Sequence, residues 1–202
     1  RSYSVTGVQT CALPIFDYDI RQVHETGEDY IQNVFSAELS DAFWEVGLPQ
    51  QMNTSVASSP SFNVYLAAQI KLKDRGFLSR DIHVEDLVSL KGDVHHIFPR
   101  EYLKKRGFTK GKYNQIANYA MTQSEINIAI SSKPPSVYLK EALEQCNGGG
   151  LKYGGITRKD EMLENLKMNC IPENTIEMNY EEFLGERRRL MARKIKDYFA
   201  RL

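Results

Sequence analysis

The sequence has no surplus of charge of either sign, because 26 lysine and arginine residues are balanced by 26 aspartate and glutamate residues. The overall charge of the chain therefore cannot attract nucleic acid, and any basic surface has to be local. No apolar run approaches the roughly 20 residues that a membrane-spanning helix needs. We therefore expect no partner in the membrane.

Cysteine is also scarce, with only Cys11, Cys146 and Cys170 in 202 residues. None of them stands in a C-x-x-C pair, which argues against a structural zinc ribbon. Free thiols without a secretion signal indicate a cytoplasmic protein. The glycine-rich segment 147–155 lacks the Lys-Ser/Thr pair of a phosphate-binding loop and follows no strand. We interpret this segment as a flexible linker.

The first fifteen residues are a separate case. Residues 5–15, VTGVQTCALPI, resemble the translation of a sequencing-library adapter, and the chain begins with Arg rather than Met. A signal peptide is the weaker interpretation, because the apolar stretch is short and is interrupted by Gln9 and Thr10. We expect residues 1–15 to be non-native and the natural protein to extend further in the N-terminal direction.

The most informative feature is the run DVHHIFP at residues 93–99, followed by Asn118 and then by Asn127. Adjacent histidines at the end of a short apolar strand, closed by a proline, are costly to maintain for packing alone. His96 has the pKa range to accept a proton from water near neutral pH. His95 and Asn127 supply metal-ligand atoms from a strand and from a predicted helix. The set is typical of a one-metal nuclease centre.

This spacing resembles the His-Asn-His nuclease family, also called HNH or ββα-metal. The resemblance implies that His96 is the general base, that His95 and Asn127 bind one divalent metal, and that Asn118 supports the catalytic centre. For Asn118 we favour the role of a loop tie over that of a ligand. The family habit favours Mg²⁺ or Mn²⁺ as the metal.

The likeness extends beyond the motif. HHIFPREYL at residues 95–103, YNQIAN at 113–118 and INIAISSKPP at 126–135 resemble the C-terminal nuclease domain of GmrSD-type, modification-dependent restriction enzymes. It runs from about residue 16 to the C-terminus. The resemblance implies restriction of foreign (phage) DNA, with base-modified DNA as a candidate substrate. It also implies a missing N-terminal NTPase-like domain of the same polypeptide as a partner.

Two details of the motif bear on the metal and on the geometry. Many sites of this family have Asp where this chain has His95, and imidazole also suits Ni²⁺ or Zn²⁺. Asp93 lies two residues earlier, on the same strand face as His95, and could add a ligand or a supporting hydrogen bond. His95 and His96 would point to opposite faces of a regular strand. One site can use both only if the strand ends or bulges at His96.

Positive charge is concentrated next to this motif. The connection between the two predicted strands carries six cations against the single acid Glu101, and these cations are Arg100, Lys104, Lys105, Arg106, Lys110 and Lys112. Together with Lys133 they are the candidate contacts to a nucleic-acid backbone. We interpret the connection, with its two glycines, as a mobile loop. The cluster Arg187–Arg189 on the last helix is interpreted as mainly a solvated face.

The predicted fold class is α+β, a mostly helical domain around a small ββα-metal core. Residues 16–90 form the helical N-terminal part, 91–145 the nuclease core, and 146–202 a linker with C-terminal helices. Hydrophobic spacing predicts helices over 36–46, 62–72, 123–130, 158–168 and from about 179 onwards, with strands near 93–96 and 116–121. Asn179 and Glu182 form a capping box at the start of the last helix.

Two other function classes fit the same residues. The chain could be a catalytically silent module that keeps the fold and binds DNA or protein. It could also cut RNA, because phosphodiester chemistry at His96 would serve either polymer. A metal requirement and sensitivity to His96→Ala separate the first alternative from an endonuclease, and a substrate panel separates the second.

Overall fold

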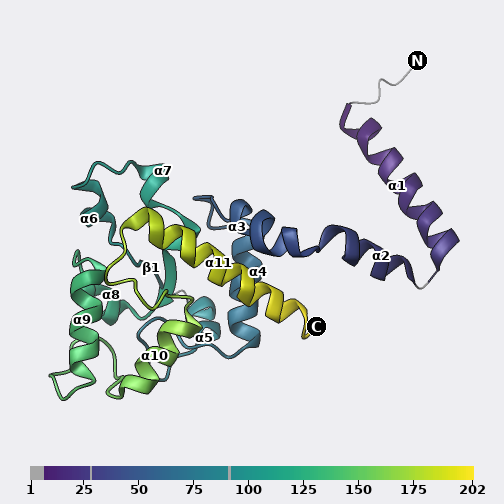
Figure 1. The fold of residues 1–202 in the computed structure, drawn as a ribbon. Coiled ribbons are helices and arrows are strands. Elements are labelled where there is room, and N and C mark those ends of the chain that lie inside the picture. The colour runs from purple at the N-terminus through teal and green to yellow at the C-terminus, as the bar shows by residue number, and fades with distance from the viewer. Residues whose placement is uncertain (1–6, 28, 91) are drawn as a thin grey trace. The chain divides into compact units, whose positions relative to one another are not determined.

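The computed structural model describes residues 7–27, 29–90 and 92–202. The fold is α+β and mostly helical, and the described residues contain a sheet of two antiparallel strands (Figure 1). The chain divides into two compact units, one ending at Phe43 and the other running from Trp44 to Leu202. Within the described ranges, no helix is long and apolar enough to cross a membrane.

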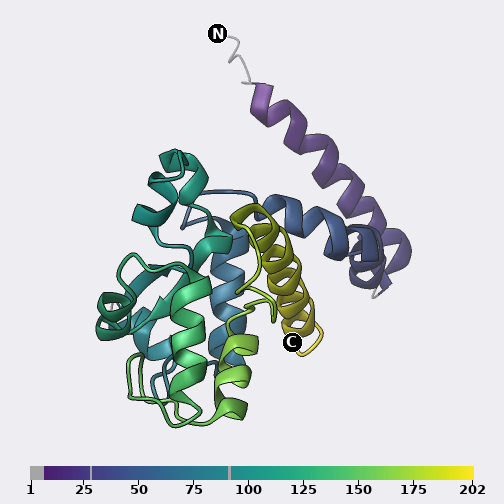
Figure 2. The same ribbon diagram turned by 60° about the vertical axis from the view of Figure 1, so that its left-hand side comes forward.

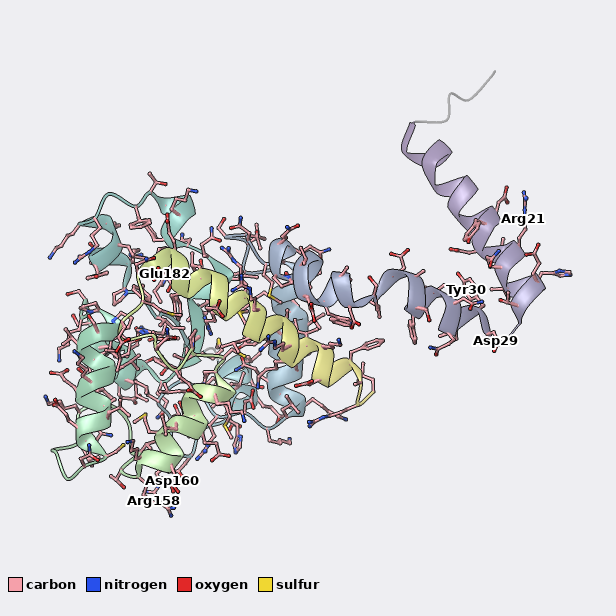
Figure 3. All side chains as sticks on the ribbon, in the orientation of Figure 1. Arg21, Asp29, Tyr30, Arg158, Asp160 and Glu182 are labelled. Atoms are coloured by element: carbon pink, nitrogen blue, oxygen red, sulfur yellow. The ribbon has the colours of Figure 1, made fainter. Side chains whose placement is uncertain are left out.

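The first unit holds helices α1 (Gly7–Thr26) and α2 (Asp29–Glu38). Tyr30 lies at the start of α2 (Figure 3), and its pKa is raised first by desolvation and then by the hydrogen bond with Asp19 of α1. Of the residues that we set aside as non-native, 7–15 form the first part of α1, and 1–6 lie outside the described residues.

The predicted helix over residues 36–46 is wrong. Helix α2 ends at Glu38, and a π-helical turn, η1 (Phe43–Gly47), leads into the short helix α3 (Leu48–Gln51). The hydroxyl of Ser40 accepts the backbone N–H of Phe43 at 3.4 Å, so this serine begins a new helical turn. The apolar residues keep their helical spacing across the break, so the spacing does not reveal it. The helix is interrupted by a serine that caps the following turn.

The second unit is built on the long helix α11 (Tyr180–Phe199), which packs against α3 and α4 (Pro60–Lys71). Figures 1 and 2 show α4 and α11 side by side. The capping box predicted at Asn179 and Glu182 is confirmed, since the Asn179 side chain accepts two backbone N–H groups and Glu182 accepts the N–H of Asn179. Helix α4 was placed correctly, but its buried face is formed by Phe62, Tyr65, Ala68 and Gln69.

The sheet pairs β1 (Asp93–His96) with β2 (Tyr119–Thr122), with Asp93 opposite Thr122 and His96 opposite Tyr119. Helix α5 (Val84–Ser89) packs against β2 and precedes β1. The second strand starts later than predicted, because residues 116–118 form a 3₁₀ turn, η2 (Ile116–Asn118). Helix α8 (Ser124–Ile130) follows β2 directly and packs against β1.

The connection between the strands is not a mobile loop. It contains two short helices, α6 (Arg100–Lys104) and α7 (Lys110–Tyr113). Buried Leu103 and Tyr113 anchor them, which leaves the cations exposed on the opposite side. The anchors were overlooked because single apolar residues in a polar segment give no periodic signal.

After α8 the chain forms α9 (Pro135–Gln145) and α10 (Lys159–Met168). Arg158 forms an ion pair with Asp160 at the start of α10 (Figure 3). The segment between these helices is packed rather than a flexible linker. Tyr153 is 1% exposed, and the buried side chain of Gln145 accepts the backbone N–H groups of Lys152 and Tyr153.

The interpretation of the last arginine cluster as a solvated face is wrong for Arg187, which is fully buried at 0% exposure. Its guanidinium donates to the carbonyl oxygen of Ala117 at 2.9 Å and to that of Asn169 at 3.2 and 3.3 Å. Arg187 therefore ties α11 to the turn that precedes β2. A buried guanidinium is tolerated here because carbonyl oxygens accept its protons.

Candidate functional site

The two adjacent histidines line one cavity, although neighbours on a regular strand point apart. Strand β1 ends at His96, and the backbone N–H of Ile97 then donates to Asn118 of η2. The cavity has a volume of about 320 Å³ and is lined by His95, His96 and Asn127, among other residues. The strand ends at His96, as the use of both histidines by one site requires, and both residues line the cavity.

His95 belongs to a chain of three polar side chains. Its Nδ1 lies 2.8 Å from the amide oxygen of Asn127, and the amide nitrogen of Asn127 donates to Asp93 at 3.2 Å. Asp93 thereby turns the oxygen of Asn127 towards His95. Burial lowers the pKa of His95 to about 4, so the imidazole is neutral at pH 7.

These residues fit a divalent cation. Nδ1 of His95 is the ring nitrogen that lies next to the amide oxygen of Asn127, whereas Nε2 is buried without a hydrogen-bond partner in the described structure. The 2.8 Å between Nδ1 of His95 and the oxygen of Asn127 is close to the separation of about 3 Å between adjacent ligands of an ion bound at roughly 2.1 Å. Among the described residues, no group of three His, Cys, Asp or Glu side chains is arranged to hold a metal. An ion here would therefore complete its coordination with water.

His96 is held by a residue to which the sequence analysis assigned no role. Its Nε2 lies 2.9 Å from the amide oxygen of Asn114. Because that oxygen can only accept, Nε2 carries the proton of the neutral ring and Nδ1 keeps a free lone pair. Burial lowers the pKa of His96, and the positive charge of Arg100 lowers it further. The arrangement is that of a general base with an orienting partner.

Asn118 acts as the loop tie that we predicted, and its side chain is fully buried. Its amide oxygen accepts the N–H of Phe98 at 2.8 Å, while its nitrogen donates to the carbonyl oxygens of Phe98 and Tyr113, each at 3.1 Å. These bonds fix the backbone of Phe98, just before Pro99, and that of Tyr113 at the end of α7. Asn118 therefore shapes the turn after His96 and does not line the cavity, so it is a positioning residue and not a group that would contact the substrate.

The predicted cations lie unevenly around the cavity. Arg100 lines it together with Glu101, which pairs with Arg100 at 3.4 Å and with Lys104 at 2.9 Å. The guanidinium of Arg106 stacks over the ring of Tyr102 at 3.7 Å. The whole set on α6, α7 and the turn between them is exposed, namely Arg100, Lys104, Lys105, Arg106, Lys110 and Lys112. It forms a basic surface next to His96.

Lys133 differs from the other predicted cations because its charge is matched within the protein. Its Nζ lies 2.8 Å from Glu141 and 2.8 Å from the hydroxyl of Tyr153, which itself donates to Glu141. The hydrogen bond from Lys133 is the main reason that the pKa of Glu141 falls to about 2. This group ties the end of α8 to α9.

Comparisons with known proteins reveal a distant relative. No family model matches the chain, and no solved structure matches it. The uncharacterized protein MJ0686 of Methanocaldococcus jannaschii is 28% identical to this chain over 124 residues, which is 55% of this chain and 21% of that protein. The matched part therefore spans about a fifth of the relative's length.

Proposed function

We propose that this chain is a metal-dependent endonuclease of the HNH type that hydrolyses phosphodiester bonds in DNA. The observation that carries the proposal is the cavity that joins an oriented, neutral His96 to the pair formed by His95 and Asn127. A general base beside a candidate metal site is the arrangement that water-driven phosphodiester hydrolysis requires.

In this proposal, Nδ1 of His96 takes a proton from a water molecule as its oxygen attacks the phosphorus atom. The bond from phosphorus to the 3′ oxygen breaks, and the products are a 5′-phosphate and a 3′ hydroxyl once that oxygen gains a proton from solvent. Asn114 keeps Nδ1 available by accepting the proton on Nε2. A divalent cation held by His95 and Asn127 would supply positive charge that stabilises the phosphate and the departing oxygen.

The exposed cations of α6 and α7 support a nucleic-acid substrate. Arg100 lines the cavity and the other five follow it on the same connection, and phosphate contacts position a strand without reading its sequence. Restriction of modified or phage DNA, and control by an N-terminal NTPase-like domain, are proposed from the resemblance to GmrSD-type enzymes. RNA cleavage is the competing outcome, because the proposed base would act on either polymer.

The test is nicking of supercoiled plasmid by the full chain with Mg²⁺, Mn²⁺, Ni²⁺, Zn²⁺ or excess chelator. We expect metal-dependent nicking that falls by about 10²–10⁴-fold in His96→Ala, the usual contribution of a general base. His24→Ala, which removes a histidine from α1, is the matched control and should retain activity. A parallel panel with single-stranded and double-stranded RNA separates the two polymers.

Nicking that persists in His96→Ala would refute the role of the base. Absence of metal binding by the folded chain in calorimetry would refute the metal site. Metal binding without cleavage of any polymer would favour the silent binding module.

A further inference from the structure

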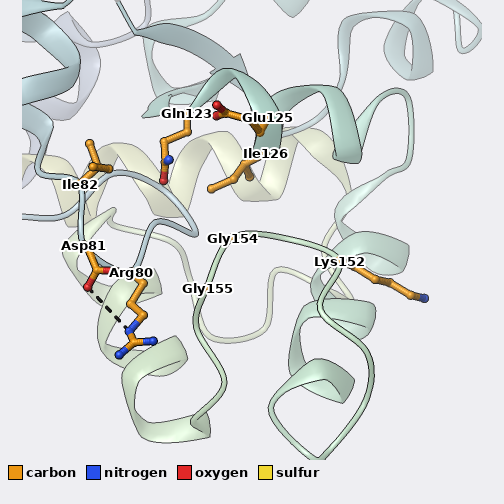
Figure 4. A pocket seen from close by; sticks show the side chains of 9 residues that line it. All are labelled: Arg80, Asp81, Ile82, Gln123, Glu125, Ile126, Lys152, Gly154 and Gly155. Atoms are coloured by element: carbon orange, nitrogen blue, oxygen red, sulfur yellow. Dashed lines mark ion pairs between the residues drawn. The ribbon is translucent and has the colours of Figure 1, made fainter.

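A second cavity of about 330 Å³ lies beside the start of α8 (Figure 4). This volume falls in the range of roughly 300–1,000 Å³ that is typical of small-ligand sites. Its walls come from three segments far apart in the sequence, namely residues 80–82, 123–126 and 152–155. The proposed nuclease mechanism uses none of these residues.

The charges around this cavity cancel. Arg80 and Lys152 are opposed by Asp81 and Glu125, and Arg80 pairs loosely with Asp81 at 3.7 Å. Lys152 forms an ion pair with Glu141 at 3.2 Å. Figure 4 shows the side chain of Lys152 directed away from the other lining residues. A phosphate would find little net attraction here. The rim suits a ligand without net charge.

The interior combines apolar walls with unused hydrogen-bond donors. Ile82 and Ile126 supply aliphatic surface, and the amide of Gln123 extends between them (Figure 4). The oxygen of Gln123 accepts the hydroxyl of Ser79 at 2.9 Å, which leaves the amide nitrogen free among the described residues. The backbone N–H groups of Gly154 and Gly155 also donate to no acceptor in the described part of the chain. A planar heterocycle requires apolar contacts on its faces and hydrogen-bond donors at its edge, and the cavity offers both.

Helix α8 connects this cavity with the candidate nuclease site, because Gln123 lines the one and Asn127 lines the other. Gln123 precedes Asn127 by one helical turn, and the N–H of Asn127 donates to the carbonyl oxygen of Gln123. One turn advances a helix by about 5.4 Å, and residues four apart lie on the same face. Thr122, just before Gln123, pairs with Asp93, whose carboxylate orients Asn127.

We propose that this second cavity holds an unstacked nucleobase of the strand whose phosphate enters the candidate nuclease site. The proposal rests on the proposed function for the identity of the polymer. The isoleucine side chains would cover the faces of the base, and Gln123 with the two glycine N–H groups would bind acceptor atoms on its edge. A base that is already unpaired enters such a site at the lowest cost, since unstacking from a duplex costs a few kcal/mol.

Gly155 offers a way to fill the cavity without unfolding the protein. A Cβ atom added there would lie 3.4 Å from Cδ of Arg80, which is an ordinary contact. Gly154 is unsuitable, because its φ is +58° and an added Cβ would lie 2.2 Å from the carbonyl oxygen of Leu78. Gly155→Leu therefore fills the cavity, Gly155→Ala adds only a methyl group, and Gly150→Leu places the same side chain in open space.

The experiment follows amide signals by NMR while short single-stranded oligonucleotides are added to the full chain in chelator, so that no cleavage occurs. The probes are DNA and RNA strands with bases and a strand of equal length and charge that consists of abasic deoxyribose phosphates. We expect the signals of Gly155 and of the Gln123 side chain to shift with the base-bearing strands and not with the abasic strand. Affinity should fall about tenfold in Gly155→Leu, as expected for the loss of one stacked base, and remain near wild type in Gly155→Ala and Gly150→Leu.

Equal shifts with the abasic strand would overturn the proposal in favour of a phosphate site. Plasmid nicking without any shift at Gly155 or Gln123 would overturn the base site and leave the nuclease intact. Base-dependent shifts in a chain that cuts no polymer would keep the base site and reject the proposed function. A stronger response to RNA or to DNA identifies the strand that supplies the base.

Discussion

The imidazole of His96 donates its Nε2 proton to the amide oxygen of Asn114 over 2.9 Å, across 18 residues of sequence. Asn114 follows the last residue of α7, so the basic connection and the proposed catalytic base are joined by one hydrogen bond. The helices that would bind the phosphate backbone therefore also orient the group that would activate water. This coupling makes Asn114 the most informative position for testing the proposed mechanism.

Replacing this amide by a carboxylate should shift the pH dependence of nicking. In Asn114→Asp the added negative charge favours the protonated imidazole, which raises the pKa of His96. A base has to be neutral to act, so activity at pH 6 should fall by roughly tenfold and recover at pH 8–9. Rates measured from pH 5.5 to 9 check this, with the exposed Asn147→Asp as control. An unchanged profile would contradict the orienting role.

The burial of His95 should make folding sensitive to acid. Its pKa is about 4 in the folded protein against 6.5 for the free side chain, so the unfolded chain binds the proton more readily. The stabilisation is therefore complete above pH 6.5 and is lost as the pH falls towards 4, with an upper magnitude of about 3 kcal/mol. Urea unfolding between pH 7.5 and 4 measures it. The ring of His95 stacks on that of Phe77, so His95→Phe, which keeps a ring there, should lose this part of the pH dependence.

Removal of the loop tie should destabilise the protein strongly. Asn118→Ala eliminates three buried hydrogen bonds and leaves the N–H of Phe98 without a partner. We expect a loss of about 2–4 kcal/mol, since each unsatisfied buried group costs roughly 1–3 kcal/mol. Asn63→Ala, at an exposed position on α4, should stay within about 0.5 kcal/mol of wild type. Equal melting temperatures for the two variants would refute the role of Asn118 as a loop tie.

The buried guanidinium of Arg187 should matter far more than its exposed neighbour. Arg187→Met keeps much of the side-chain volume but leaves the carbonyl oxygens of Ala117 and Asn169 unpaired. A loss of about 2–4 kcal/mol is expected, against less than about 0.5 kcal/mol for Arg189→Met. Chemical denaturation of both variants at equal ionic strength measures the difference. Similar denaturation midpoints for the two variants would contradict the buried role of Arg187 and favour the solvated face that the sequence predicted.

Local signals identified most of the helices in the second unit. Helices α4, α8, α10 and α11 were located correctly because their apolar residues recur at helical spacing or because a proline or a capping box marks their start. The same signals failed to identify the packed face of α4. Apolar Val64 on this helix is 41% exposed, whereas polar Gln69 is buried. The partner of a helix, α11 in this case, decides which face is covered.

What the sequence by itself determined was local: the capping box of α11, the strand that ends in two histidines, and the order of the residues in the candidate site. The tertiary structure alone decided the role of Asn114, the burial of Arg187 and the packing of Tyr153 and Gly154. Each of these depends on contacts between residues that are from 8 to 70 or more positions apart, as when Arg187 donates to the carbonyl oxygen of Ala117. Periodicity and capping report on neighbours within one or two helical turns, whereas hydrogen-bond partners of buried groups are chosen when distant segments pack together.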